Sequence, residues 1–160
     1  MKNKKHLPIY GVGPIYGFSI IVLTVVGIVM SCFEIINYGK FVENKIPFFI
    51  IGILILAYGF SVWFRGAFKI GKYITANQLC AEGIYAIVRN PCYSGGIMLM
   101  CTGTIFIANN VFLLILPFLY WIFMTLLMKN TEEKWLYNIY GKEYLGYCKK
   151  VNRCIPWFKG

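Results

Sequence analysis

Four long apolar runs constrain this chain more than any other feature. They extend over about Ile15–Ile36, Ile46–Phe64, Tyr93–Ala108 and Val111–Met128. A transmembrane helix needs about 20 apolar residues, with a range of roughly 17–25, so the third run is marginal and the other three are long enough. Hydrophobic residues make up 59% of the chain and charged residues only 14%, which leaves too little polar surface for a water-soluble domain. We therefore predict an all-α integral membrane protein with about four transmembrane helices.

The distribution of positive charge predicts how these helices are oriented. Fourteen of the 16 Lys and Arg residues lie before the first run, between the second and third, or after the fourth. Only Lys40 and Lys45 lie between the first two runs, and the Asn109–Asn110 turn carries none. Because cytoplasmic loops are enriched in Lys and Arg, we expect both termini and the middle loop in the cytoplasm. The net charge of +10 then faces anionic lipid, and nucleic acid is not expected as a partner.

Two polar segments accompany the apolar runs. The segment Arg65–Arg89 is polar without being rich in Pro or Ser, which predicts an ordered loop. From Thr131 onward, aromatic and apolar residues recur at helical spacing with Lys between them, which predicts an amphipathic helix in the lipid headgroup zone. The first run is too long for the hydrophobic part of a signal peptide, so we expect it to be retained. We see no internal repeat or linker, and we expect a single domain over residues 1–160.

Polar motifs stand at two of the predicted membrane boundaries. Arg89-Asn90-Pro91-Cys92-Tyr93 opens the third run, and Glu132-Glu133 follows the fourth. Asn and Pro are preferred residues at a helix start, so the first motif is explained by capping alone, or by a helix N-terminus that offers N–H groups to a carboxylate. The two Glu residues can likewise cap the next helix or bind a cation or ribose hydroxyls. Since both junctions flank the same boundary, we expect them to converge on a cofactor site in a membrane-embedded enzyme.

Two further residue types bear on this site. The six cysteines form no C-x-x-C pair, and the single histidine, His6, lies near the N-terminus, so no metal site is predicted. Gly95, Gly96 and Gly103 lie in the third run. They predict either close helix packing through small residues or room for a flat ligand against the backbone.

Taken together, the motifs of residues 77–157 resemble those of the integral-membrane methyltransferases, which include isoprenylcysteine carboxyl methyltransferases and phospholipid N-methyltransferases. The family pattern is G-x-Y, R-[HN]-P-x-Y-x-G, a hydrophobic hairpin, E-E, [FY]-G-x-E-Y-x-x-Y and V-x-R-x-[IL]-P. The matching residues are Gly83-Ile84-Tyr85, Arg89–Tyr93 with Gly95, Glu132-Glu133, Tyr140–Tyr144 with Tyr147, and Val151–Pro156. Order and spacing agree throughout this half of the chain, whereas the first two runs match only in hydrophobicity.

The resemblance implies a methyltransferase that binds S-adenosylmethionine on the cytoplasmic side and takes a lipophilic acceptor from the bilayer. The acceptor classes are an isoprenylcysteine-type carboxylate, a lipid amine or a small thiol. The implied donor-binding residues are Asn77, Gln78, Leu79, Cys80, Tyr85, Asn90, Pro91, Cys92, Tyr93, Glu132 and Glu133. Arg89 or Lys129 would orient an anionic acceptor.

Three positions depart from the carboxyl methyltransferases. Asn90 stands in place of a His, as in the phospholipid enzymes, and Asn77 stands where the carboxyl methyltransferases tend to place another His. Their substrate-orienting Arg falls on Met128, with Lys129 as the nearest cation. These departures concern the acceptor and leave the implied donor site intact.

Two other interpretations are open at this point. A membrane reductase of related fold would use a reduced nicotinamide cofactor, with Tyr93 as the proton donor. A non-catalytic membrane scaffold would bind no donor and would tolerate changes at Asn90 and Glu132. Binding of adenosylmethionine, compared with binding of reduced nicotinamide cofactor, distinguishes the three.

Overall fold

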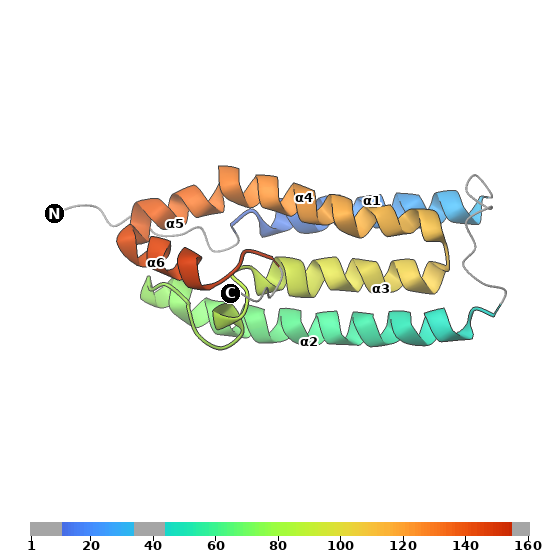
Figure 1. Ribbon diagram of the computed structural model, residues 1–160, viewed down its shortest axis with the longest axis horizontal. Coiled ribbons are helices and arrows are strands. Elements are labelled where there is room, and N and C mark those ends of the chain that lie inside the picture. Colours follow the sequence, from blue (N-terminus) through green and yellow to red (C-terminus); the bar gives the residue numbers. More distant parts are fainter. Residues whose placement is uncertain (1–10, 34–43, 155–160) are drawn as a thin grey trace.

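The computed structural model describes residues 11–33 and 44–154. The main helices are α1 (Gly13–Cys32), α2 (Ile46–Ala76), α3 (Leu99–Ala108), α4 (Ile115–Asn130), α5 (Glu132–Tyr140) and α6 (Lys142–Lys150). Three short helical segments are η2 (Gly83–Ala86), η3 (Cys92–Met98) and η4 (Val111–Leu114). Helices α1 to α4 run alongside one another as a bundle, and α5 and α6 fold over one end of it (Figure 1).

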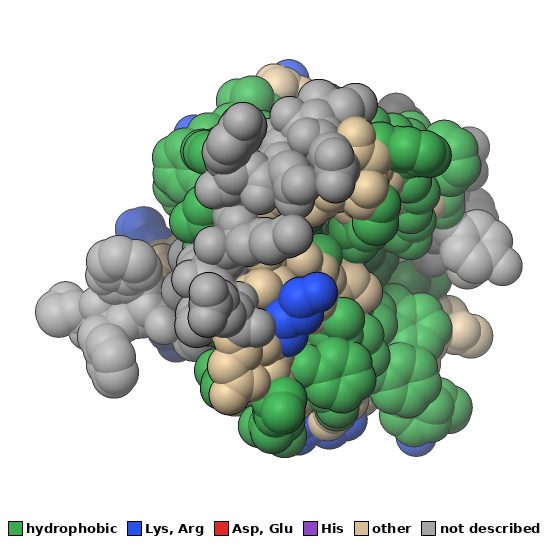
Figure 2. All heavy atoms as spheres, turned by 90° about the vertical axis from the view of Figure 1, so that its right-hand side faces the viewer, with side chains coloured by type: hydrophobic (Ala, Val, Ile, Leu, Met, Phe, Trp, Pro, Cys, Tyr) green, Lys and Arg blue, Asp and Glu red, His purple; other side chains and the backbone are tan. Residues whose placement is uncertain are grey.

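The predicted fold class, an all-α membrane protein, is confirmed. Within the described residues, three helical stretches are long and apolar enough to cross a membrane: Gly13–Cys32, Ile46–Ala76 and Val111–Tyr140. The run predicted as marginal forms the shorter apolar helix Cys92–Ala108. Large hydrophobic side chains cover the sides of the bundle, as the end-on view of Figure 2 shows, and Phe18 and Leu54 are 73% and 64% exposed. Such a surface requires lipid as its solvent.

Small residues set the packing of the third helical run against α2. A Cβ atom built on Gly103 would lie 2.7 Å from the carbonyl oxygen of Gly52, and one built on Gly96 would lie 2.7 Å from Cβ of Trp63. These contacts are shorter than van der Waals distances, so the two backbones meet only because side chains are missing. Gly96 and Gly103 therefore serve close helix packing, and neither leaves room for a flat ligand.

Aromatic residues of α1 and α4 fill the centre of the bundle. Tyr16 is fully buried, stacks on Phe123 at 5.9 Å between ring centroids, and meets the edge of Tyr93 at 5.7 Å. The buried hydroxyls of Thr24 and Tyr120 are paired at 2.7 Å, which offsets the cost of placing polar groups in an apolar interior. This core holds α1 against the third run and α4.

Helix α2 is longer than predicted, which corrects the boundary of the middle loop. The apolar run was expected to end at Phe64, but the helix continues to Ala76, because no Pro interrupts the residues after Arg65 and Gly66 packs closely against Cys92 of the third run. It ends where Asn77 adopts a left-handed conformation with φ of 51° and the Gln78 N–H donates to the Tyr73 carbonyl at 2.9 Å, a Schellman-type end. The loop therefore begins at Asn77 rather than at Arg65.

The tail, defined as residues 132–154, also differs from the prediction. One continuous amphipathic helix was expected, but α5 and α6 are separated at Gly141, whose φ is 54°. The left-handed backbone at this glycine redirects the chain. Tyr144, Tyr147 and Val151 are consequently buried in a cluster that includes Leu79 of the middle loop. The tail thus covers the middle loop with its apolar face.

Candidate functional site

The Arg89–Tyr93 motif lies where the middle loop enters the third helical run. The backbone N–H groups of Tyr93 and Ser94 both donate to the Asn90 carbonyl, at 3.1 and 3.0 Å. The following segment, η3, is a π-helix, a wider helix that is frequent at functional sites. The Asn90 side chain does not cap this helix. Its amide nitrogen Nδ2 instead donates to the carbonyl of Arg153 at 3.1 Å, so the motif is bound to the tail.

Glu132 joins three distant segments. Its Oε1 accepts a hydrogen bond from the Tyr93 hydroxyl at 2.8 Å and another from the Val12 N–H at 2.8 Å. Gly11, which has φ of +51°, lies directly against this carboxylate, where a Cβ atom would collide with Oε1. The start of the described chain, the third run and the beginning of α5 therefore meet at one carboxylate.

Glu133 is enclosed by two guanidinium groups. Arg153 binds it in a bidentate manner, with Nη2 at 2.9 Å from Oε2 and Nε at 2.5 Å from Oε1. Arg89 lies 3.4 Å from Oε1, and both the Arg89 and Glu133 side chains are largely buried, at 10% and 18% exposed. The hydrogen bond to Glu133 raises the pKa of Arg153. Arg89 also donates to the Tyr144 hydroxyl at 3.3 Å and contacts Cys148 Sγ at 2.6 Å.

Backbone pairing ties the tail to the middle loop. Val88 and Asn152 form a parallel β-bridge, and the Arg89 and Asn90 N–H groups donate to the Asn152 and Arg153 carbonyls at 2.8 and 3.2 Å. The Tyr147 hydroxyl donates to the Tyr85 carbonyl at 2.6 Å. Loop and tail are thus held as one polar assembly at a single end of the bundle (Figure 1).

Three buried polar atoms in this assembly lack a hydrogen-bond partner within the described part of the chain. They are Asn77 Oδ1, Arg89 Nε and the Tyr140 hydroxyl. Tyr140 packs against the Tyr144–Tyr147 cluster, as does Leu79, two residues after Asn77, and Arg89 bonds Tyr144. A buried polar group without a partner costs about 1–3 kcal/mol. A polar ligand or water that reached Asn77 Oδ1 or the Tyr140 hydroxyl would remove this cost.

Three titratable groups in this assembly, Tyr85, Tyr147 and Cys80, stay neutral alongside the charged cluster of Arg89, Glu133 and Arg153. Burial raises the pKa of the Tyr85 and Tyr147 hydroxyls and of the Cys80 thiol. At neutral pH all three are uncharged and act only as hydrogen-bonding or packing groups. Such a site suits binding and orientation of a ligand rather than acid–base chemistry by these residues.

The structure brings together many of the predicted site residues. Tyr93 meets Glu132, Arg89 meets Glu133, and the Tyr85 hydroxyl lies 3.6 Å from Cys92 Sγ. Pro91 and Cys80 are buried nearby in the same loop, and Leu79 packs on the tail. By contrast, the side chains of Asn77, Gln78 and Lys129 make no hydrogen bond or ion pair with the others in the described structure. Lys129 is exposed at the end of α4.

Two residues of this assembly had no role in the sequence predictions. Arg153 lies in the V-x-R-x-I-P motif. A cation in this motif, predicted to lie at the same membrane boundary as Glu133, is a sequence signal that could have indicated the ion pair. Val12 contributes a backbone N–H, and no sequence pattern marks such a donor.

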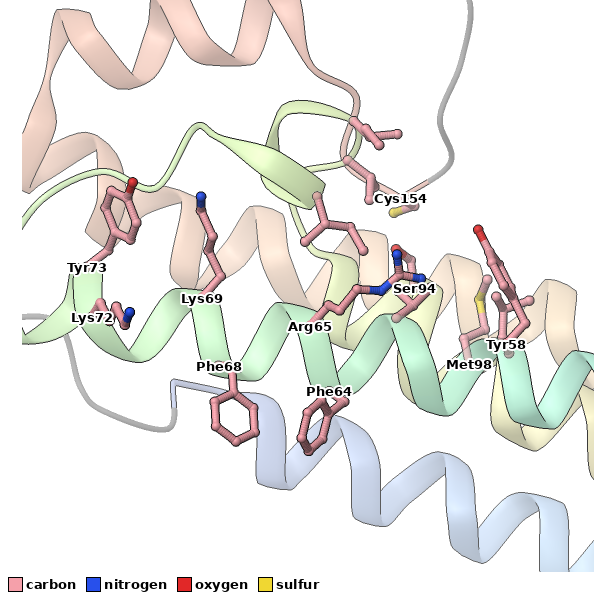
Figure 3. A pocket seen from close by; sticks show the side chains of 16 residues that line it. Tyr58, Phe64, Arg65, Phe68, Lys69, Lys72, Tyr73, Ser94, Met98 and Cys154 are labelled. Atoms are coloured by element: carbon pink, nitrogen blue, oxygen red, sulfur yellow. The ribbon is translucent and has the colours of Figure 1, made fainter.

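A groove of about 980 Å³ runs along α2 beside this assembly (Figure 3). On α2 it is lined by Tyr58, Val62, Arg65, Lys69 and Tyr73, among others. Its far wall is formed by Ile84, Ile87 and Val88 of the loop, by Ser94, Gly95, Met98 and Leu99 of the third run, and by Cys154. The α2 residues recur every three or four positions, so they share one helix face. From the sequence, Arg65 and Lys69 were expected only as loop cations, because the second apolar run was predicted to end at Phe64.

Comparison with known proteins bears on the activity of this site. Over 78 residues the chain is 35% identical to a protein-S-isoprenylcysteine O-methyltransferase of Schizosaccharomyces pombe, covering 49% of this chain and 33% of that protein. Over 81 residues it is 26% identical to protein-S-isoprenylcysteine O-methyltransferase B of Arabidopsis thaliana, covering 51% and 41%. The chain therefore spans a third to two-fifths of the length of these curated relatives. No solved structure matches it significantly.

The family model for phospholipid methyltransferases matches residues 46–143. That range contains α2, the middle loop, the third helical run, Glu132 with Glu133, and the start of α6. It therefore includes the Arg89–Tyr93 motif and both Glu residues, whereas Val12, most of α6 and the Asn152–Arg153 segment lie outside it. The chain belongs to the phospholipid methyltransferase family.

Proposed function

We propose that this protein transfers a methyl group from S-adenosylmethionine to a lipophilic acceptor. The main support is the convergence of the Asn90–Tyr93 turn, Glu132 and the tail in one polar assembly at the end of a lipid-facing bundle. Family membership implies a methyl donor, and the two curated relatives carry the name of methyltransferases that act on isoprenylcysteine.

The polar assembly has groups that fit such a donor. Asn77 Oδ1 and the Tyr140 hydroxyl are buried and have no partner in the described residues, so they would bond the amino, carboxylate or hydroxyl groups of the donor. Glu132 would hold its ammonium or ribose, with Tyr93 keeping the carboxylate in place. When bound, the donor supplies an electrophilic sulfonium methyl, for which the protein needs to provide alignment and exclusion of water.

Arg89 and Glu133 have a different role in this proposal from the one that the resemblance implies. Arg89 is engaged with Glu133, Tyr144 and Cys148, and Glu133 is chelated by Arg153. Neither charge is available to orient an acceptor or to bind a donor without breaking these pairs. We propose that both are positioning residues, which hold the loop and the tail together around the donor.

The site is proposed to face the cytoplasm. The start of α1 and the end of α4 lie at the same end of the bundle as the tail and the middle loop (Figure 1). Arg65, Lys69, Lys72 and Arg89 belong to segments at that end. Because positive charge is retained on the cytoplasmic side, this end is assigned to the cytoplasm, where adenosylmethionine is available.

Calorimetric titration of the detergent-solubilised chain tests the proposal. We expect adenosylmethionine to bind and reduced nicotinamide dinucleotides not to bind. Glu132→Gln keeps an acceptor oxygen for Tyr93 and Val12 but removes the charge, so donor affinity should fall by about tenfold or more. Glu143→Gln, at an exposed position of α6, is the matched control and should bind as the unmodified chain does. Normal donor binding by the Glu132 variant would refute the assignment of Glu132, and preference for the nicotinamide would refute the methyltransferase function.

A further inference from the structure

The turn that leads into α1, Gly11-Val12-Gly13, encloses the carboxylate of Glu132. The Val12 N–H donates to Glu132 Oε1 at 2.8 Å. Gly11 is left-handed, with φ of 51°, and Val12 follows with φ of −96° and ψ of 7°, close to the right-handed helical region. Successive residues of opposite hand direct neighbouring N–H groups to one concave side, an arrangement that binds anions. Here the anion is a side chain of the same protein.

Both glycines of this turn are needed for its close approach to the Glu132–Tyr93 pair. A Cβ atom on Gly11 would collide with Glu132 Oε1, and the left-handed backbone there also disfavours a side chain. A Cβ atom on Gly13 would lie 3.0 Å from Cε1 and 3.2 Å from the hydroxyl oxygen of Tyr93. Val12, between them, is 4% exposed and belongs to the core of the bundle. The turn is therefore anchored by packing and fitted to these two side chains.

The two oxygens of the Glu132 carboxylate are used differently. Oε1 accepts from both the Val12 N–H and the Tyr93 hydroxyl, each at 2.8 Å. Within residues 11–33 and 44–154, Oε2 accepts no hydrogen bond, although each carboxylate oxygen can accept about two. Two donors from separate segments fix the position of one oxygen, and the rigid carboxylate then fixes the other. Such support from neighbouring groups is what a binding side chain needs in order to be preorganised.

Capping of α1 is the competing explanation for this contact. The first N–H groups of a helix lack partners within the helix and attract negative charge, and Val12, the N-cap of α1, provides no side-chain bond. However, a Ser, Thr, Asp or Asn at position 12 would supply a cap locally. The chain has Val there instead, between two glycines, and takes its acceptor from 120 positions away. The arrangement therefore serves the placement of Glu132 as well as the start of α1.

We propose that the Gly11-Val12-Gly13 turn is a positioning element of the donor site. It holds Glu132 through Oε1 and leaves Oε2 for the ammonium or ribose hydroxyls of adenosylmethionine. The turn and α1 lie outside residues 46–143, the range that the family model matches, so they add a segment of this chain to the site. This inference rests on the proposed methyltransferase function and specifies how the same site orients its donor.

A double-mutant cycle between Gly11 and Glu132 tests the inference. Adenosylmethionine binding is measured by calorimetry on the full chain in detergent. Gly11→Ala, which displaces the carboxylate, should weaken binding on the order of tenfold. In the Glu132→Gln background the same change should weaken it less than about twofold further, because the charge that the turn positions is already absent. Gly27→Ala is the matched control on α1: its methyl group would lie 3.0 Å from Leu113 Cδ2, so it should lower the unfolding midpoint and leave donor affinity unchanged.

The outcomes separate this inference from the function on which it rests. Unchanged donor affinity in Gly11→Ala, or an equal loss in both backgrounds, would overturn the positioning role alone, because the turn would then act only as a cap of α1. A loss of affinity in Gly27→Ala as large as that in Gly11→Ala would overturn it too. If Gly11→Ala does not fold, Gly11→Asn takes its place in the cycle, since Asn tolerates the left-handed backbone and still brings a Cβ atom. Failure of the unmodified chain to bind adenosylmethionine would refute the methyltransferase function and this role with it.

Discussion

At the scale of single residues, the polar assembly is built from charges that satisfy one another away from water. Glu133 has two guanidinium partners, and Glu132 takes two hydrogen bonds from neutral donors. A partly buried charge is stable only while its partners are present. Removing one partner leaves the other charge buried and unpaired, and this costs more stability than the intact ion pair contributes. These residues are consequently sensitive to substitution whether or not they contact a ligand.

Glu133→Gln should destabilise the fold by about 2 kcal/mol, because Arg89 and Arg153 would both be left partly buried without a carboxylate. The measurement is thermal unfolding in detergent, without donor. Glu143→Gln serves again as the control, since Glu143 is exposed. An unfolding midpoint equal to that of the unmodified chain would show that the ion-pair cluster does not support the fold.

Tyr147→Phe should loosen the middle loop without unfolding the bundle. It removes the donor to the Tyr85 carbonyl, which costs about 1–2 kcal/mol where the acceptor stays buried. Hydrogen exchange of amides in residues 84–90 should become faster, while exchange in α3 stays unchanged. Tyr137→Phe, at a ring that is 50% exposed, should alter neither region, and slow exchange in the Tyr147 variant would argue against a tether between tail and loop.

At the scale of elements, the α2–α3 contact positions both the groove and the Arg89–Tyr93 turn. Lipid provides no hydrophobic drive for two apolar helices to associate, so close backbone approach has to supply the attraction. Gly52 opposite Gly103 and Gly66 opposite Cys92 set that approach at two depths. A change in this contact would therefore shift the groove and the turn together.

The same substitution at two glycines should have opposite effects on stability. Gly103→Ala places a methyl group 2.7 Å from the Gly52 carbonyl oxygen and should destabilise by roughly 1–3 kcal/mol. Gly71→Ala, on the projecting end of α2 with no atom within 4 Å of the new Cβ, should be neutral or stabilising by up to about 1 kcal/mol. Both are measured by thermal unfolding in detergent. Equal effects would mean that helix propensity, rather than packing, controls this interface.

At the scale of the whole molecule, the two ends of the bundle differ in charge and in the segments that cover them. One end carries the middle loop and the tail, with their ion pairs, and the other carries the Asn109–Asn110 turn, which is held to α1 by a hydrogen bond from Asn110 to Ser31 at 2.8 Å. An asymmetric charge distribution of this kind orients a membrane protein.

Reporter fusions should place both termini in the cytoplasm and the region near Asn44 outside it. Fluorescent-protein fusions at either terminus should be bright, and alkaline phosphatase inserted after Asn44 should be active, because the phosphatase folds only after export. The reciprocal fusions provide the control. Termini on opposite sides of the membrane would refute the four-span topology and the cytoplasmic site together.

The sequence by itself determined that the chain spans a membrane as helices, where each apolar run lies, and which polar motifs stand at its boundaries. Hydropathy sums over about 20 neighbouring residues, and helix-start signals act within one turn, so both are readable locally. Asn90 and Pro91 were thus correctly placed at the entry to the third run. The extension of α2 to Ala76 was not, since the polar residues after Phe64 suit a loop as well as a helix that projects into water.

Only the tertiary structure decided which partner each polar group takes. Glu133 pairs with Arg153, 20 positions away, and with Arg89, 44 positions away, and Glu132 bonds a backbone N–H 120 positions away. Such contacts require segments that are distant in the sequence to lie within a few ångströms of one another, and the sequence pattern does not say where those segments lie. Many other pairings of Glu with Arg or Lys would give the same sequence pattern. The groove arises in the same way, because its walls come from α2, the loop, the third run and the tail, which the packed bundle alone brings to one face.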